Sequence, residues 1–165
     1  MHTRFLKLRH GLPLLVRPLR HGDVESVLAV FERLSEGSRR ARFNGAKPCL
    51  SADELRALAA EDETHHVLVA WVDGDPRPVA IARLARQGRA SAEIAFAVAD
   101  AYQHRGVGSA LAAELVADAR AAGITEITAL TSGDNRAAVA LLRRIASVVD
   151  VRFEGPDLSI RAAIA

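Results

Sequence analysis

The sequence has little of several features that would mark a special class of protein. Its 165 residues include one cysteine, Cys49, so no disulfide can form within the chain, which is consistent with a reducing compartment. Aromatic residues make up 4%, so the core must be built mainly from Ala, Leu and Val. The first ten residues lack the apolar stretch of a signal peptide, and no apolar run is long enough to span a bilayer. We therefore expect a soluble, cytoplasmic protein that does not bind membranes.

The sequence also has little net charge and no obvious set of metal ligands. The formal net charge is only +2, which argues against a general affinity for nucleic acid. His65 and His66 are adjacent but have no third ligand near them in sequence, so we expect no metal site. A dense basic cluster, Arg39, Arg40 and Arg42, lies in a stretch, 38–48, that we predict to be irregular.

The pattern of apolar residues and turn signals predicts one domain over residues 1–165. Asp23 is a predicted helix N-cap, and Ser51 with Glu54 forms a predicted capping box. The expected strands are 14–17, 66–72, 79–84, 91–99, 124–131, 148–153 and 158–163, and the expected helices are 24 to about 36, 52 to about 58, 106–122 and 135–146. This order, β-α-α-β-β-β-α-β-α-β-β, predicts an α/β (α+β) fold. Its mixed central sheet has helices on both faces, because a three-strand meander leads into a βαβ crossover.

The segment from 98 to 110 carries the strongest functional signal. A buried strand ends at Val98, a short loop contains Gly106 and Gly108, and a helix begins there. Glycines allow close approach of the backbone, and the free N–H groups at a helix start attract anions, so the segment suits a pyrophosphate. It is not a P-loop, which needs Gly-Lys-Ser/Thr, nor a Rossmann fingerprint, where Leu111 would be glycine. A tight turn that binds nothing is the alternative.

A resemblance adds to this reading. The run Gln103-His104-Arg105-Gly106-Val107-Gly108 matches the Gln/Arg-x-x-Gly-x-Gly/Ala signature of the GNAT superfamily of N-acetyltransferases, and the element order is similar over nearly the whole chain. The resemblance implies acetyl-CoA as cosubstrate, held between strands that splay apart at 94–98 and 127–131. The implied cofactor-binding residues are Phe96, Val98, Gln103, His104, Arg105, Gly106, Val107, Gly108, Ser109 and Asn135. Within this set, the backbone of Phe96 and Val98 would hold pantetheine, and the N–H groups from His104 to Ser109 the pyrophosphate. Arg105 either adds charge to the phosphates or is solvated.

Glu93 is the candidate general base. A lysine acceptor must lose a proton to react, and a carboxylate among apolar neighbours has the raised pKa that a base requires. The alternative is that Glu93 pairs with an arginine such as Arg83 or Arg42. The segment Ala-Glu-x-x-x-x-Val and the arginine-rich stretch 34–43 resemble the bacterial protein-lysine acetyltransferase branch, which implies a protein lysine as acceptor and Glu93 as base.

The sequence departs from the family pattern at the general acid. Many members have a tyrosine seven residues after the asparagine that matches Asn135, but here Leu142 stands there, and Tyr102 does not match that role. We expect an enzyme that moves an acetyl group from acetyl-CoA to a primary amine, on a small molecule or a protein lysine. The alternative is an acyl-CoA-binding sensor without turnover. The cluster of Arg39, Arg40 and Arg42 either binds an acidic substrate or the CoA 3′-phosphate, or is solvated. The final hairpin offers an edge for a possible homodimer.

Overall fold

The computed structural model describes residues 2–164, without the side chains of His10, Val148 and Val149. The elements are β1 (Arg4–Lys7), β2 (Pro13–Pro18), α1 (Val24–Glu32), α2 (Glu36–Phe43), α3 (Ala52–Leu58), β3 (His65–Val72), β4 (Ala80–Arg86), β5 (Ser91–Val98), α4 (Val107–Ala121), β6 (Glu126–Ser132), α5 (Arg136–Ile145), β7 (Val148–Glu154) and β8 (Asp157–Ala163). Short 3₁₀ turns lie at Arg9–Gly11 and Asp100–Tyr102. None of the helices in this part of the chain has the length and apolar character needed to cross a membrane.

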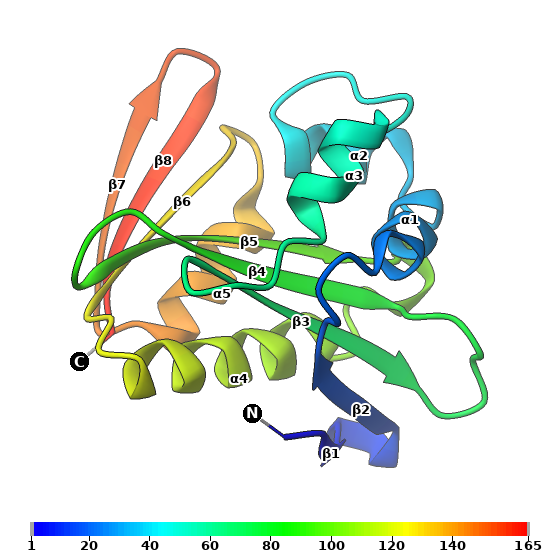
Figure 1. Ribbon diagram of the computed structural model, residues 1–165. Coiled ribbons are helices and arrows are strands. Elements are labelled where there is room, and N and C mark those ends of the chain that lie inside the picture. The colour runs from blue at the N-terminus through cyan, green and yellow to red at the C-terminus, as the bar shows by residue number, and fades with distance from the viewer. Residues whose placement is uncertain (1, 165) are drawn as a thin grey trace.

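One mixed sheet organises these elements (Figure 1). Its strand order is β1-β2-β3-β4-β5-β6-β8-β7, and every neighbouring pair is antiparallel except β5 and β6. The predicted meander is β3-β4-β5, and the predicted crossover runs from β5 through α4 to the parallel strand β6. The predicted fold class, a mixed sheet with helices on both faces, is confirmed.

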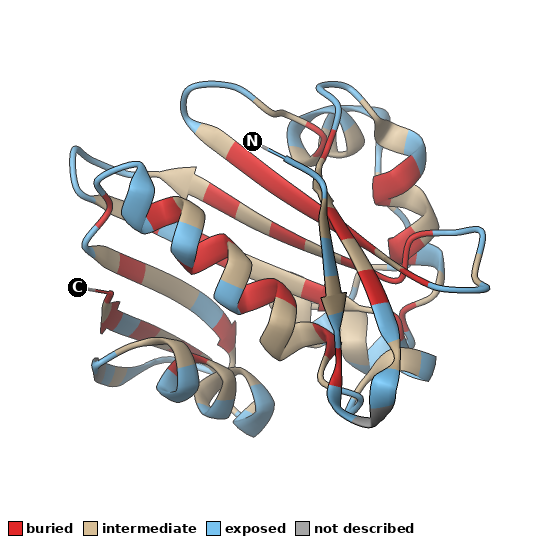
Figure 2. Ribbon diagram, turned by 90° about the horizontal axis from the view of Figure 1, so that it is seen from below, coloured by how far each residue is buried: buried red, intermediate tan, exposed pale blue. Residues whose placement is uncertain are grey.

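The two faces of the sheet have separate cores. On one face, α4 and α5 pack against the largest apolar cluster, which includes Ile94, Leu111, Leu115, Ile127 and Leu142. Buried residues recur along α4 on the side that faces the sheet (Figure 2). On the other face, α1 and α3 cover two smaller clusters, one with Val27, Val67 and Val69 and one with Val30, Leu34 and Ala97. Alternation along β5 therefore sends Ile94 to the α4 side and Ala97 to the α1 side.

Local signals explain where most helices begin and end. Asp23 accepts a hydrogen bond from the Ser26 backbone N–H at 3.0 Å and starts α1. The capping box of Ser51 and Glu54 forms as predicted at the start of α3. Gly123 follows α4 with φ +77°, the left-handed conformation that ends helices at glycine.

The sequence prediction was wrong about the stretch 38–48. Residues Glu36–Phe43 form α2, which begins because Ser35 accepts a hydrogen bond from the Ser38 N–H at 3.2 Å, and ends at Asn44, where φ is +54°. The first helix accordingly ends at Glu32, before the expected 35–37. No residue of α2 is buried, so the helix lacks the apolar stripe from which a helix is recognised in sequence.

A strand at the N-terminus was also missed. β1 pairs only with β2 and forms one edge of the sheet, and its Phe5 is 84% exposed. Arg4 to Lys7 alternate between half-buried and exposed positions, but their two apolar residues, Phe5 and Leu6, are adjacent, so the sequence shows no alternation of apolar and polar residues that would indicate a strand. The observed order thus begins with two strands and three helices before β3.

Candidate active site

The parallel strands β5 and β6 stay together over only three residue pairs. The pairs are Ser91 with Glu126, Ala92 with Ile127, and Glu93 with Thr128, and none follows them. On its other side β5 remains paired with β4 as far as Val98. The predicted divergence of 94–98 from 127–131 is therefore present, and one edge of β5 is open beyond Glu93.

Backbone groups of Phe96 and Val98 face this open edge of β5. The Ala99 N–H donates to the Val79 carbonyl at 2.8 Å, which continues the β4–β5 ladder. Because alternate residues of a strand point their backbone groups to opposite sides, the odd-numbered residues of β5 bond to β4. The even-numbered residues Phe96 and Val98 present their N–H and C=O groups toward the side from which β6 has departed.

The start of α4 presents free donors next to that edge. Gly106 is the N-cap with φ +88°, no described side chain caps it, and the first turn contains no acidic residue. The first intrahelical bond is from Ala110 N–H to the Gly106 carbonyl at 3.0 Å, so the N–H groups of residues 107–109 have no partner within the helix. A Cβ on Gly108 would lie 3.5 Å from Val98 Cγ2, so this turn packs directly on the end of β5.

The neighbouring loop residues take different positions. His104 and Arg105 are exposed, and His104 has φ +59°, which is uncommon for a residue other than glycine. The Arg105 guanidinium lies 5.5 Å from the centre of the Tyr102 ring. The Tyr102 hydroxyl donates to Asp75 Oδ2 at 2.7 Å, and Arg33 pairs with the same carboxylate at 2.5 Å. Tyr102 thus belongs to a network that holds the loop in place.

Gln103 and Asn135 make contacts inside the protein. Gln103 Nε2 donates to the Val98 carbonyl at 3.0 Å and to Ser38 Oγ at 3.1 Å, which joins the loop to both β5 and α2. Asn135 Oδ1 accepts from the Ala138 N–H at 3.1 Å and caps α5, while its Nδ2 donates to Thr131 Oγ1 at 2.7 Å. These bonds give both residues a positioning role.

Arg144 is a residue near this region that sequence reasoning missed. It lies in the last turn of α5, and its Nη1 is 3.4 Å from Ser109 Oγ in the first turn of α4. The two residues are 35 positions apart, and only the packing of α5 beside α4 brings them together. No pattern in the sequence links them, although a cation beside a free helix start strengthens an anion site.

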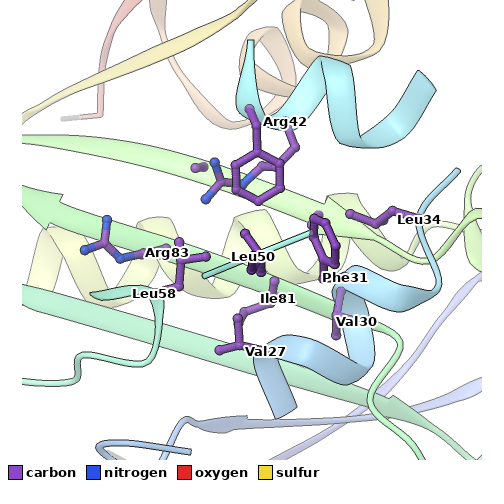
Figure 3. Close-up of a pocket in the computed structure, with 12 residues that line it drawn as sticks. Val27, Val30, Phe31, Leu34, Arg42, Leu50, Leu58, Ile81 and Arg83 are labelled. Atoms are coloured by element: carbon purple, nitrogen blue, oxygen red, sulfur yellow. The ribbon is translucent and has the colours of Figure 1, made fainter. Parts of the chain in front are cut away.

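A cavity of about 250 Å³ lies on the opposite face of the sheet. Its lining comes from α2, α3, β4, β5 and the segment before α3, and consists of Arg42, Phe43, Leu50, Glu54, Ala57, Leu58, Arg83, Glu93, Ile94 and Ala95. We call it the Arg42 pocket. It adjoins a smaller apolar hollow of about 30 Å³ between α1, α2 and the sheet, into which Val27, Val30 and Ile81 also point (Figure 3).

Glu93 lies at the Arg42 pocket, but its surroundings differ from the prediction. Its side chain is exposed, and Gln87 Nε2 donates to its Oε2 at 3.1 Å. The expectation of apolar surroundings was wrong, because alternation sends the apolar neighbours Ala92 and Ile94 to the other face of the sheet. Arg42 and Arg83 line the same pocket, yet neither lies within 4.0 Å of the Glu93 carboxylate as an ion pair of the described residues.

The predicted arginine cluster is divided by α2. Arg42 enters the pocket, whereas Arg40 is exposed. Arg39 packs over the Phe31 ring at 4.2 Å and donates to the Pro48 carbonyl at 2.9 Å. Burial, with a smaller contribution from the positive charge of Arg83, lowers the pKa of Arg42 to about 10, and Glu93 opposes this shift. Burial likewise lowers the pKa of Arg83, against the influence of Glu93 and Asp62.

No general acid comes from the position of Leu142. Its side chain is 2% exposed and packs in the core beneath α5. Among the described residues, no three His, Cys, Asp or Glu side chains gather in a way that could hold a metal ion. The groups available at the site are therefore the backbone of β5 and α4, the Glu93 carboxylate and the two arginines of the pocket.

An open strand edge beside an uncapped helix start is the arrangement that the sequence resemblance implied, and comparison with known proteins shows the family of the chain. The model of the acetyltransferase (GNAT) family matches residues 31–146, so the chain belongs to this family of acetyltransferases. It is 32% identical over 146 residues to acetyltransferase Pat of Mycolicibacterium smegmatis, covering 87% of this chain and 44% of that protein. It is 34% identical over 137 residues to acetyltransferase PA5475 of Pseudomonas aeruginosa, covering 79% of this chain and 72% of that protein.

Solved structures confirm the fold. The GNAT domain of S. lividans PAT is similar with a TM-score of 0.87 and 27% identity, over 98% of this chain and 96% of that one. The chain spans less than half the length of the Mycolicibacterium relative, so the similarity concerns one part of that protein. The predicted family is confirmed.

Proposed function

We propose that this protein transfers an acetyl group from acetyl-CoA to a primary amine, on a protein lysine or a small molecule. The observation that carries the proposal is the meeting of two features at one place. The start of α4, with its free N–H groups, packs against the end of β5, where that strand has an unpaired edge: a Cβ on Gly108 would lie 3.5 Å from Val98 Cγ2. Membership of the acetyltransferase family gives this arrangement its chemistry.

The residues present fit a CoA thioester. Three N–H groups and the positive end of a 15-residue helix suit a pyrophosphate, and Arg144 and Arg105 supply cations nearby. The backbone groups of Phe96 and Val98 suit the amides of a pantetheine arm that lies along β5 like an added strand. Gln103 would set the position of Val98 by holding its carbonyl.

In this proposal, Glu93 receives the proton that the amine loses. When bound, acetyl-CoA supplies an activated acetyl group: the carbon–nitrogen bond forms, the carbon–sulfur bond breaks, and CoA leaves as a thiolate that takes up a proton from solvent. Glu93 lies where β5 and β6 begin to diverge, so its carboxylate is near the deep end of the open edge. It accepts the amine proton directly or through a water molecule.

A sensor that binds acyl-CoA without turnover is the second candidate. The observation that favours it is Leu142, which is buried where many family members have a tyrosine acid. Thiolate is a tolerable leaving group, so the lack of this acid is compatible with catalysis. The two candidates differ in whether any amine is acetylated, and they share the same cofactor site.

The first test is calorimetric titration of the purified protein with acetyl-CoA, using Gly106→Glu as the variant. The glutamate adds a negative charge at the helix start and forces a side chain into φ +88°. Gly123→Glu is a matched control, because Gly123 has φ +77°, a Cβ there also meets nothing within 4 Å, and it lies at the other end of α4. We expect binding to be lost only in Gly106→Glu. Absence of binding to the unmodified protein would exclude both candidates.

A further inference from the structure

Two arginines of the Arg42 pocket lack the carboxylate partners that other arginines of this protein have. Arg4 pairs with Asp118 and Glu114, and Arg33 pairs with Asp75. Arg42 forms no hydrogen bond or ion pair with a described residue, and it only stacks over the Phe43 ring at 4.8 Å. Arg83 reaches one carbonyl, that of Ala57, at 3.4 Å. Their guanidinium donors are therefore largely unused.

One donor is buried as well as unused. Arg83 Nε is shielded from solvent and has no hydrogen-bond partner. A buried donor without a partner costs free energy, so this nitrogen needs an acceptor that the described residues do not provide. The two side chains line the Arg42 pocket from different elements, Arg42 from α2 and Arg83 from β4. Figure 3, which shows the adjoining hollow, includes both of them. A planar hydrogen-bond acceptor between them could accept hydrogen bonds from both guanidinium groups.

The charges around the pocket do not balance internally. Glu54 lines the pocket but is bound to Lys47, which neutralises it. Glu93 then remains as the other carboxylate of the lining, and Asp62, outside the lining, also acts on Arg83. Burial lowers the pKa of both Arg42 and Arg83, and the positive charge of Arg83 adds a smaller repulsion at Arg42. A bound anion would relieve that repulsion.

We propose that Arg42 and Arg83 bind a carboxylate that the acceptor carries close to its reacting amine, while Glu93 faces the amine. This inference rests on the proposed function, because it names the substrate class of the same site. The acceptor would then be either a free amino acid-like molecule or a lysine side chain with an acidic neighbour. Two planar guanidinium groups suit a carboxylate well, because each can donate two parallel hydrogen bonds.

The walls of the pocket indicate what kind of spacer joins the amine and the carboxylate of the acceptor. Phe43, Leu50 and Leu58 line it, so the part of the acceptor between amine and carboxylate meets apolar surface. An aliphatic spacer fits these walls, whereas a spacer rich in hydroxyl groups would be left without partners. The pocket thus favours an acceptor with an ammonium and a carboxylate at the two ends of a short hydrocarbon chain.

The first experiment measures the anion site without catalysis. Pentanoate, a monocarboxylate with an aliphatic chain and no amine, is titrated into the protein in the absence of acetyl-CoA, and binding is followed by NMR. We expect saturable binding that weakens on the order of tenfold to a hundredfold in Arg83→Gln and in Arg42→Gln. Arg40→Gln is the control, because Arg40 lies on the same helix but is exposed and outside the pocket. Arg42→Lys keeps the charge without the fork and should restore only part of the affinity.

This arm is independent of whether the protein is an acetyltransferase. If no amine is ever acetylated, pentanoate binding still reports on Arg42 and Arg83. Failure of pentanoate to bind, or equal weakening in Arg40→Gln, would overturn the anion site even in an active enzyme. Circular dichroism of each variant checks that the chain is folded. If Arg42→Gln does not fold, Arg42→Lys still tests the role of this arginine.

The second experiment separates the two sources of the carboxylate. 6-Aminohexanoate is compared with 6-aminohexanamide, and a lysine peptide with glutamate beside the lysine is compared with the same peptide carrying glutamine. A preference for the acid of about tenfold or more in kcat/KM that disappears in Arg83→Gln supports the proposal. A preference in the first pair identifies a free small molecule, and one in the second pair identifies a protein acceptor. No preference in either pair contradicts it.

Discussion

The two sides of the site differ in whether backbone atoms or side chains form them. On the proposed cofactor side, the groups are backbone atoms of one continuous stretch, from Phe96 to Ser109. On the proposed acceptor side, they are side chains from α2, α3, β4 and β5, gathered around the Arg42 pocket. Backbone geometry is dictated by glycines and by strand pairing, whereas the pocket depends on how distant segments pack. A binding site of the first kind leaves a motif in the sequence, and one of the second kind does not.

The largest effect should come from Glu93, which stands where the two sides meet. Glu93→Gln removes the base but keeps the size and the hydrogen-bonding amide, so we expect kcat to fall on the order of 10²–10⁴-fold. Affinity for acetyl-CoA should be unchanged, because the cofactor side uses backbone atoms. Steady-state kinetics and calorimetry on the same preparation check this. Full activity in the variant would mean that Glu93 serves only as a neighbour of the arginines.

The next effect concerns the conformation of Gly106. Gly106→Ala places a Cβ at φ +88°, which costs about 1–2 kcal/mol and would shift the N–H groups that follow. Gly123→Ala carries a similar strain at φ +77°. Urea unfolding should show comparable losses of stability in both variants, whereas calorimetry should show about tenfold weaker acetyl-CoA binding only in Gly106→Ala. Equal binding by the two variants would argue against a phosphate site at this turn.

A smaller effect is expected at His66, whose contact with Asp118 holds the C-terminal half of α4 against the sheet. His66 is buried between Glu61 and Asp118, with its ring nitrogens 2.9 Å from an oxygen of each. Burial acts to lower the pKa of His66, but the hydrogen bonds to the two carboxylates outweigh it and raise this pKa. The protonated ring therefore stabilises the fold fully below its unfolded pKa of about 6.5, and this contribution is lost as pH rises through the raised folded value.

The measurement is urea unfolding of the native protein and of His66→Gln between pH 5.5 and pH 9. We expect the difference in stability between the two to shrink by about 1.5–3 kcal/mol toward high pH, the range for hydrogen bonds to charged groups. Acetyl-CoA affinity at fixed pH should be the same in both, because this network lies toward the other end of α4. A difference that does not change with pH would show that the ring is neutral in the folded protein.

The smallest effect concerns Gln103, which joins the two sides. Gln103→Ala removes the bonds to the Val98 carbonyl and to Ser38, and should cost about 1 kcal/mol of stability. Acetyl-CoA binding should weaken only a few-fold, since the side chain positions β5. Calorimetry that shows a much larger loss of affinity at unchanged stability would instead mean that Gln103 contacts the cofactor directly, as the sequence resemblance implied.

The sequence allowed most of the fold to be predicted, because local signals and periodicity agree in most elements. The caps at Asp23 and Ser51 and the glycine after α4 all lie where they were expected. Helix α2 was missed because it buries no apolar face and is held by its cap and by the contact from Thr131 Oγ1 to the Ala41 carbonyl at 3.1 Å. That contact spans 90 residues, and no local pattern reports it.

For the site, the limit of prediction follows the same division between backbone and side chains. The glycines and the helix start predicted a phosphate site at 103–109 from sequence, and this stays a prediction. Arg83 was considered only as a possible partner for Glu93, and its place beside Arg42 in one pocket depends on how β4 and α2 pack together. Arg144 gave no signal at all. The expected apolar surroundings of Glu93 were wrong because sequence neighbours on a strand lie on opposite faces of the sheet.

The alternation along β5 has a consequence for how such a protein can change over evolutionary time. Main-chain groups of its even-numbered residues face the open edge, while side chains at Glu93 and Ala95 face the Arg42 pocket. Substitutions at these odd positions alter the pocket and leave the backbone on the open edge in place. One strand can therefore keep a constant acyl donor while its acceptor is replaced, so a lineage can acquire new substrates by point mutation without rebuilding the fold.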